Sequence, residues 1–169
     1  MTFGLVLLVA FLVIFYTVGF GLLWNTALEA WRSTKASNWP TTPASITLLE
    51  VGENSDGEGG TTYELKVQYR YTVDGVVYES SRLAFGYRGS SDRDVPQKLL
   101  QKLKSARSVS ARYSSDNPAT SCLSYGLHQS IQFRFAFAIT WLLFCVGFTL
   151  VAWLSSRPDL VLLNNLSIE

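Results

Sequence analysis

Few side chains in this chain have the types and spacing that build a catalytic site. His128 is the only histidine among the 169 residues, and no cysteine or carboxylate stands near it at the spacing of metal ligands. The sequence lacks the motifs of serine nucleophiles, phosphate-binding loops and zinc sites. We therefore expect no enzyme, no catalytic residue and no cofactor, and we interpret His128 as a polar residue at the level of the lipid headgroups.

Three acidic residues in one glycine-rich segment come nearest to a metal site. Glu53, Asp56 and Glu58 lie in GENSDGEGG, but their spacing differs from that of a calcium-binding loop. Charged, glycine-rich hairpin loops are also common without ions. We expect no metal there and interpret the segment as a loop between two strands.

A basic cluster marks the region around residues 98–112. It consists of Lys98, Lys102, Lys104, Arg107 and Arg112. Such a cluster can contact anionic lipid or an acidic partner, or it can be the solvated face of an amphipathic helix. Residues 25–127 hold 12 of the 14 basic and 11 of the 13 acidic side chains, a net charge of only +1, so we expect no nucleic acid partner.

The segment AFGYRGSSDRD, Ala84 to Asp94, is the candidate interaction surface. Phe85, Tyr87 and Arg88 combine the aromatic and guanidinium groups that dominate binding energies, and the glycines let a loop adapt. We name these three side chains as possible interaction residues. The alternative is that Phe85 and Tyr87 close the core beside the following helix.

Two long runs of uncharged residues flank the polar middle segment, which would hold any functional site. Phe3 to Trp24 spans about 33 Å as a helix, and Phe135 to Leu154 is comparable, so each is long enough to cross a bilayer. The opening MTFG has no basic residue, which favours an uncleaved anchor over a signal peptide. The expected organisation is transmembrane helix 1–24, juxtamembrane helix 25–39, soluble β-rich domain 40–127, transmembrane helix 130–154 and C-terminal tail 155–169.

The sequence gives conflicting signals about the side of the membrane that the middle segment faces. Arg32, Lys35 and Arg134 flank this segment against Arg157 on the other side, which indicates the cytoplasm. The charge rule loses force for loops longer than about 60 residues, and the Ser, Thr and Tyr content favours an extracytoplasmic domain. We prefer the extracytoplasmic side of a bacterial inner membrane and leave the cytoplasmic alternative open.

Alternation of apolar and polar residues predicts a mostly antiparallel β-domain with one short helix. In YELKVQYRYTVDGVVYES the odd positions from Tyr63 to Val73 are apolar, and Asp74-Gly75 is typical of a two-residue hairpin turn. The predicted pairs are Val73 with Val76, Tyr71 with Tyr78 and Tyr69 with Ser80. A bulge at Ser80–Arg82 would restore the register of the third strand.

Further elements complete the predicted domain. A strand begins at Pro43, a helix covers SDRDVPQKLLQKLKS, and strands follow in SVSARYS and SCLSYG. Cys122 and Cys145 lie in different segments, so we expect no disulfide between them. The predicted core contains Tyr69, Tyr71, Val73, Tyr78, Leu99, Leu103 and Tyr113.

Two tyrosine-rich motifs carry a resemblance to a known family. Tyr69, Tyr71, Val73 and Gly75 form a Tyr-x-Tyr-x-Val-x-Gly hairpin, and Tyr113, Asp116, Asn117 and Pro118 loosely match a second motif of the type Val-x-Tyr-Tyr-Asp-Pro. The chain from about Trp39 to Leu127, with its flanking spans, resembles the bacterial membrane-protein family catalogued as domain of unknown function 3592. It departs from the family pattern at Arg112 and at the SS that follows Tyr113. The resemblance implies a fold and no established activity.

The function that these observations favour is binding. We expect a two-pass membrane protein that presents a β-domain for protein or lipid interaction, with an accessory or immunity-type role. The alternative is a non-catalytic subunit of a membrane enzyme or transporter complex. The expected partners are the lipid bilayer and a membrane or extracytoplasmic protein.

Overall fold

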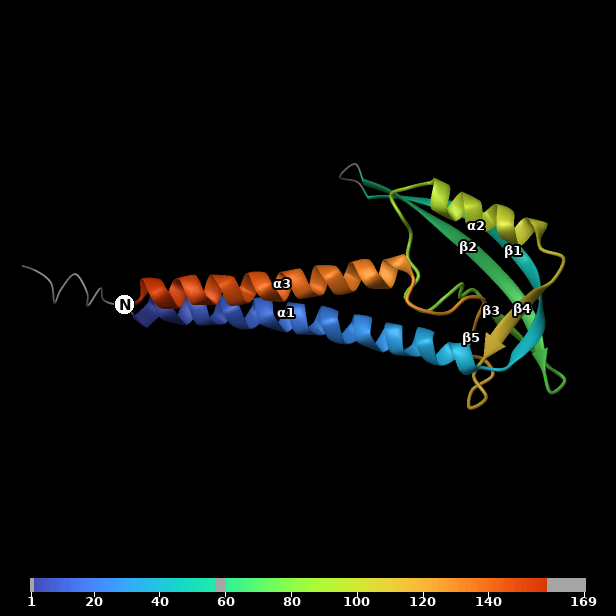
Figure 1. Cartoon of the computed structure of the whole chain (residues 1–169), viewed down its shortest axis with the longest axis horizontal. Coiled ribbons are helices and arrows are strands. Elements are labelled where there is room, and N and C mark those ends of the chain that lie inside the picture. The colour runs from blue at the N-terminus through green and yellow to red at the C-terminus, as the bar shows by residue number, and fades with distance from the viewer. Residues whose placement is uncertain (1, 57–59, 158–169) are drawn as a thin grey trace, which may run out of the picture. The chain divides into compact units, whose positions relative to one another are not determined.

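The computed structural model of the chain describes residues 2–56 and 60–157. The chain separates into two compact units (Figure 1). Residues 1–25 and 134–169 form the first, which we call the helical unit, and Thr26–Phe133 forms the second, which we call the sheet unit. The expected tail 155–169 lies outside the described residues from position 158 onward.

Two long apolar helices run through both units. Helix α1 comprises Thr2–Lys35 and helix α3 comprises Gln129–Ser155, and a short 3-10 helix, η1 (Ala36–Asn38), follows α1. By length and composition both long helices can cross a membrane. Only 6% and 11% of the residues in their most apolar stretches are buried, whereas the core helix of a soluble protein is mostly buried.

Aromatic residues and one glycine hold the two helices together inside the helical unit. The Trp141 indole donates a hydrogen bond to the Phe15 carbonyl at 3.0 Å, and the two rings stack at 5.2 Å. The Tyr16 hydroxyl lies 3.2 Å from the Thr149 hydroxyl. Gly19 faces the partner helix so closely that an added Cβ would stand 2.6 Å from Leu142 Cδ2. Small residues of this kind allow apolar helices to approach each other.

The sheet unit is built on one five-stranded antiparallel sheet with the strand order β3-β2-β1-β4-β5. The strands are β1 (Thr41–Asp56), β2 (Gly60–Val73), β3 (Val76–Ser80), β4 (Val109–Tyr113) and β5 (Ser121–Cys122). Helix α2 (Asp94–Ser105) packs on β1 and β2 (Figure 1). The expected fold class, two long apolar helices flanking an antiparallel sheet with one short helix, is confirmed.

The hairpin between β2 and β3 has the predicted register. Val73 pairs with Val76, Tyr71 with Tyr78 and Tyr69 with Ser80. Asp74 and Gly75 both take positive φ, at 50° and 80°, as a type I′ turn requires. The turn residues therefore fix the pairing register of β2 and β3.

That buried face forms the core. Leu65, Val67, Tyr69, Tyr71 and Val73 of β2 are all buried, and the leucines of α2 pack against them. All seven predicted core residues belong to this cluster: Tyr69, Tyr71 and Val73 are buried, and Tyr78, Leu99, Leu103 and Tyr113 are packed around them. The alternation in the sequence was sufficient to identify this face, because successive side chains of a strand point to opposite sides.

Two local strand predictions are wrong. The segment Gly52–Gly60 is not a loop throughout, since β1 continues to Asp56 and pairs along β2 back to Gly60. Cross-strand pairing from the apolar part of the hairpin extends through this polar stretch. The irregularity in the sheet lies between Ile46 and Leu48 of β1, whereas β3 ends at Ser80 without a bulge. Leu83 and Phe85 need no strand register, because the chain has already left the sheet.

Candidate functional site

The segment 81–90 that follows β3, which we call the connecting loop, is fastened to the sheet at both ends. Near its start the Leu83 carbonyl accepts hydrogen bonds from the Leu123 and Ser124 amides at 3.0 and 2.7 Å. At its end Ser90 and Tyr63 exchange two backbone hydrogen bonds of 2.7 and 2.9 Å. The loop is therefore hydrogen-bonded to the sheet unit near both of its ends.

The middle of the connecting loop is held by the beginning of α3 and the region just before it. The His128 ring lies with Nε2 2.8 Å from the Phe85 carbonyl, and the Ser130 hydroxyl donates to the Arg88 carbonyl at 3.4 Å. Gly86 has φ +70°, and a Cβ there would stand 2.9 Å from Glu29 Oε2 of α1 and 3.0 Å from Ile131. Only glycine fits this close approach without strain. His128 thus positions a loop.

Phe85 lies inside the domain. Its side chain is only 8% exposed and its ring meets Trp39 edge-on at 5.7 Å. The Arg82 guanidinium lies 4.6 Å above the same ring. Phe85 therefore fits the alternative that the sequence left open, in which it closes the core, because the ring completes a small apolar cluster with Ala36 and Cys122.

Tyr87 is half-buried and packs against the main core. Its hydroxyl accepts a hydrogen bond from the Leu65 amide of β2 at 3.1 Å. Burial raises the pKa of Tyr87, the Leu65 hydrogen bond opposes this shift, and the nearby Glu64 carboxylate adds to it. The phenol is therefore neutral at physiological pH. Tyr87 closes the core beside the sheet, which is the alternative that the sequence left open for it.

A polar cleft of about 660 Å³ opens beside the connecting loop. Its walls come from α1, from β1 and β2, from the end of β3 and from the loop itself. The lining residues are Glu29, Asn54, Thr62, Glu64, Leu65, Ser80, Ser81, Arg82, Leu83, Ala84, Gly86, Tyr87, Arg88 and Gly89. Of the three predicted interaction residues, Tyr87 and Arg88 line the cleft and Phe85 does not.

Glu64 and Arg88 are lining residues of opposite charge whose backbone positions lie close together. A Cβ on Gly89 would stand 3.4 Å from Glu64 Cβ and 3.0 Å from the Tyr63 carbonyl oxygen, so the strand and the loop touch here. Arg88 is exposed and Glu64 is half-buried. Arg70 and Glu79 form an ion pair elsewhere on the sheet. The cleft thus offers a carboxylate and a guanidinium to a ligand.

Comparison of the sequence with known protein families identifies one match. Residues 42–128 match the family described as Domain of unknown function (DUF3592). The chain belongs to this DUF3592 family. Among the residues that line the polar cleft, Glu29 alone lies outside the matched range of the DUF3592 domain. No curated protein and no solved structure matches the chain.

The two tyrosine motifs of the DUF3592 domain meet in space. The Tyr71 hydroxyl of the hairpin donates a hydrogen bond to the Pro118 carbonyl at 2.5 Å. The Tyr69 hydroxyl lies 2.9 Å from the Ser121 hydroxyl and donates to the Arg82 carbonyl at 3.1 Å. The hairpin tyrosines therefore tie the turn after β4 and the connecting loop to the core, so the motif residues have a structural role.

Arg112, where the chain departs from the family pattern, also has a clear structural role. Its guanidinium donates to the carbonyls of Ser37 and Trp39 at 2.9 and 3.0 Å and lies 4.5 Å above the Tyr125 ring. These contacts fasten β4 to the end of η1. Arg112 is therefore separate in role from the basic cluster that the sequence suggested.

The rest of that cluster follows helix α2 of the DUF3592 domain. Lys98, Lys102 and Lys104 are exposed, whereas Leu99 and Leu103 face the core. The helix begins where the Asp92 carboxylate accepts the Asp94 amide at 2.8 Å. This arrangement is that of an amphipathic helix with a solvated basic face, and contact with an anionic partner stays a prediction.

Among the residues that the structure describes, neither the acidic side chains nor the cysteines gather into a metal site. The described residues contain no group of three His, Cys, Asp or Glu side chains that could hold a metal ion. Glu53 is exposed on β1, and Glu58 and the side chain of Asp56 lie outside what the structure describes. Cys122 and Cys145 are both free and buried.

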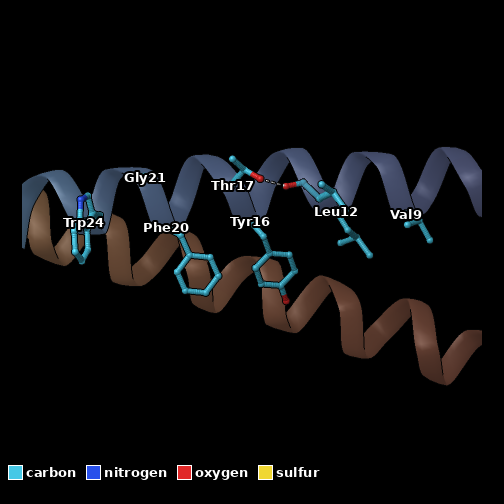
Figure 2. A pocket seen from close by; sticks show the side chains of 8 residues that line it. Val9, Leu12, Tyr16, Thr17, Phe20, Gly21 and Trp24 are labelled. Atoms are coloured by element: carbon cyan, nitrogen blue, oxygen red, sulfur yellow. Dashed lines mark hydrogen bonds between the residues drawn. The ribbon is translucent and has the colours of Figure 1, made fainter.

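An apolar groove of about 680 Å³ runs along α1 in the helical unit (Figure 2). Val9, Leu12, Phe20 and Trp24 are among its lining residues. The Thr17 hydroxyl on this face already donates to the Val13 carbonyl at 2.7 Å. The lining is otherwise mostly apolar, apart from the Tyr16 hydroxyl, which lies 3.2 Å from the Thr149 hydroxyl.

Proposed function

We propose that the chain is a two-pass membrane protein whose sheet unit works by binding and has no catalytic activity of its own. Two long, apolar and mostly exposed helices support the membrane anchoring. Burying such helices in a bilayer removes their apolar side chains from water.

The main support for a binding role is the polar cleft. It is lined by carboxylate, guanidinium, hydroxyl and amide groups from segments far apart in the sequence. The connecting loop that forms one wall is fastened by hydrogen bonds at its start, middle and end. A wall that is already ordered loses little conformational entropy when a ligand binds.

We also propose where the protein lies and what it binds. The membrane is a bacterial inner membrane, and the sheet unit faces the extracytoplasmic side, where its ligand is a membrane lipid or a segment of another membrane or extracytoplasmic protein. The Ser, Thr and Tyr content of residues 40–127 supports this side.

Alkaline carbonate washing of membranes tests the anchoring. We expect the chain to stay in the pellet, because two inserted helices resist a treatment that releases peripheral proteins. Appearance of the chain in the supernatant would contradict the proposal.

A matched pair of double variants tests the binding site. Glu64→Gln with Arg88→Ala removes one carboxylate and one guanidinium from the cleft. Glu50→Gln with Lys66→Ala removes one charge of each sign from a cross-strand pair on the exposed side of the sheet. After gentle solubilisation, mass spectrometry should find the ligand of the wild-type protein with the second variant and not with the first. Equal retention by both folded variants would exclude the cleft.

A further inference from the structure

We infer that the outer edge of β3 pairs with the same edge of a second copy of this chain, so that two sheets join into one across a twofold axis. The inference concerns the sheet unit alone and rests neither on the polar cleft nor on the proposed membrane anchoring. Three features carry it: the backbone groups that β3 directs away from the sheet, the exposed side chain of Val77, and the fit of this edge to itself.

Strand β3 is an edge strand, and it lacks the features that usually keep an edge from pairing. It stands at one end of the strand order and pairs with β2 along its whole length without a register shift. Its sequence VVYES contains no proline or lysine, which natural proteins often place on exposed edges. At the opposite end of the sheet β5 has only two residues, and both are buried. The β3 edge is therefore the one that can accept another strand.

Alternate residues of β3 direct their backbone groups away from the sheet. The turn bonds the Val76 amide to the Val73 carbonyl, and hydrogen-bonded pairs of an antiparallel ladder recur at every second residue. The even-numbered residues of β3 thus bond to β2. The amides and carbonyls of Val77 and Glu79 point to the outer side, and they lie symmetrically about Tyr78.

One antiparallel register of two β3 strands overlaps all five residues of each strand. Tyr78 then lies on the axis opposite its own equivalent, and Val77 of each copy lies opposite Glu79 of the other. The outward amides and carbonyls of these two residues all bond across the axis. The register centred on Glu79 would instead set two carboxylates directly opposite each other, which is destabilising. The backbone pattern and the charges therefore favour the same register.

The side chains of β3 suit this contact on both faces of the sheet. Val77 is 62% exposed, and pairing would cover part of its apolar surface. On the core face Tyr78 stacks on Tyr71 at 5.7 Å, so pairing would continue this stack across the axis. On the outer face Glu79 forms an ion pair with Arg70, which balances its charge beside the axis. The edge thus fits a second copy of itself.

The small size of the edge determines the kind of dimer to expect. A strand of five residues buries less surface than the interfaces of stable dimers do, so the dimer should dissociate on dilution. The contact uses the same edge of both copies and closes after two, and the short β5 offers little edge for further strands. We therefore expect a closed, concentration-dependent dimer.

Disulfide trapping in cells that express the full chain tests the inference. Two tagged forms with Cys122→Ala and Cys145→Ala are co-expressed, one with Val77→Cys and one with Glu79→Cys. Cα atoms of opposite residues lie about 5.5 Å apart in a hydrogen-bonded pair, which a disulfide can span, whereas diagonal neighbours lie about 7 to 8 Å apart. After oxidation we expect the product of the two forms to exceed each product of one form with itself by at least about fivefold, above the roughly twofold ratio of random pairing.

A matched pair of charge variants provides a second readout. Val77→Glu sets carboxylates opposite each other across the axis, and Gln68→Glu adds the same charge on the exposed side of β2. Sedimentation velocity of the full chain in detergent over a concentration series measures the dimer content. We expect dimerisation to weaken about tenfold with Val77→Glu and to stay at the wild-type level with Gln68→Glu.

The inference would be overturned by either experiment. Trapping that gives the three products in their random ratio, or none, from chains with wild-type melting temperatures would exclude the contact. An excess of one form paired with itself would exclude the register. Equal dimer content for Val77→Glu and Gln68→Glu, or a wild-type chain that stays monomeric at every concentration, would show that the β3 edge does not bind a second copy.

Discussion

At the scale of single residues, the phenol of Tyr87 takes the place of a missing strand. Strand β3 ends at Ser80, opposite Tyr69, so β2 loses that neighbour before it reaches Leu65. The Leu65 amide is instead satisfied by the Tyr87 hydroxyl at 3.1 Å. A buried amide without a partner costs about as much as a lost hydrogen bond, so this one side chain lets the strand end early and leaves room for the cleft.

We predict that Tyr87→Phe destabilises the sheet unit by about 1 to 2 kcal/mol, because the substitution keeps the ring and leaves the Leu65 amide unpaired. Thermal unfolding in detergent measures the loss. Tyr125→Phe is the control, since that residue is 47% exposed. Equal melting temperatures for the two variants would show that the Tyr87 hydroxyl is dispensable.

Cys122 gives the sheet unit a dependence on alkaline pH. Burial raises the pKa of its thiol from 9.0 to about 11, against the opposing influence of Arg82 and Arg112. Below pH 9 the Cys122 thiol does not reduce the free energy of unfolding, because the folded and the unfolded chain both keep its proton. Between pH 9 and 11 the unfolded chain loses a proton that the folded chain retains, so the free energy of unfolding falls by up to about 1.4 kcal/mol per pH unit.

The melting temperature should therefore decline more steeply between pH 9 and 10 in the wild-type protein than in Cys122→Ala. This range lies below the ordinary ionisation of tyrosine, which limits the contribution of the phenols. Parallel declines in the two proteins would mean that the thiol ionises as easily in the folded chain as in the unfolded one.

At the scale of elements, the hairpin was predictable because its determinants are local. Alternation from Tyr63 to Val73 and the Asp74-Gly75 turn together fix the register and the buried face. The end of β3 at Ser80 was not predictable in this way. It depends on the tertiary contacts that Leu83 and Phe85 make with η1, with β5 and with the residues after β5.

The candidate site was only partly predictable, for the same reason. The composition of Ala84 to Asp94 identified the right segment and two of the lining residues, Tyr87 and Arg88. Glu29 and Glu64 carry no local signal, since each occupies an ordinary polar position of a helix or a strand. Tertiary structure alone brings them to one cleft, and it also buries Phe85, whose sequence context resembles that of an exposed loop.

The contact between α1 and α3 depends on Gly19. Gly19→Ala would place a Cβ 2.6 Å from Leu142 Cδ2 and 2.8 Å from the Trp141 ring, whereas a Cβ at Gly21 meets nothing within 4 Å. Both substitutions gain similar helix propensity, so the difference between them reports packing. We expect Gly19→Ala to have the lower melting temperature, by a free energy of about 1 to 3 kcal/mol. Indistinguishable variants would mean that this helix contact is loose.

At the scale of the whole molecule, both long helices continue into the sheet unit. Near the end of α1, the hydroxyl of buried Ser33 donates to the Gly126 carbonyl at 2.9 Å, and the Ser33 backbone carbonyl accepts from the Gly126 amide at 3.2 Å. Ile131, near the start of α3, is fully buried beside the connecting loop. Within the sheet unit, the end of α1 and the start of α3 are thus both fixed to ordered segments of this unit.

Labelling of one introduced cysteine can show which side of the membrane the sheet unit faces. Ser55 is exposed on β1, so Ser55→Cys in a background with Cys122→Ala and Cys145→Ala offers one accessible thiol. We predict labelling by a membrane-impermeant maleimide on intact cells or spheroplasts, as an extracytoplasmic domain requires. Labelling only after lysis would place the unit in the cytoplasm, in agreement with the count of Arg32, Lys35 and Arg134.

Photo-crosslinking in intact membranes tests most directly whether the sheet unit binds a ligand in its polar cleft. Benzoylphenylalanine replaces either Ser81, on the wall of the cleft, or Gln68, on the exposed side of the sheet. After irradiation, mass spectrometry of the purified chain identifies what each position has captured. We predict a defined lipid or protein adduct at position 81 that Glu64→Gln with Arg88→Ala abolishes, and none at position 68. Absence of a specific adduct at position 81 in a folded, membrane-inserted chain would contradict the binding role.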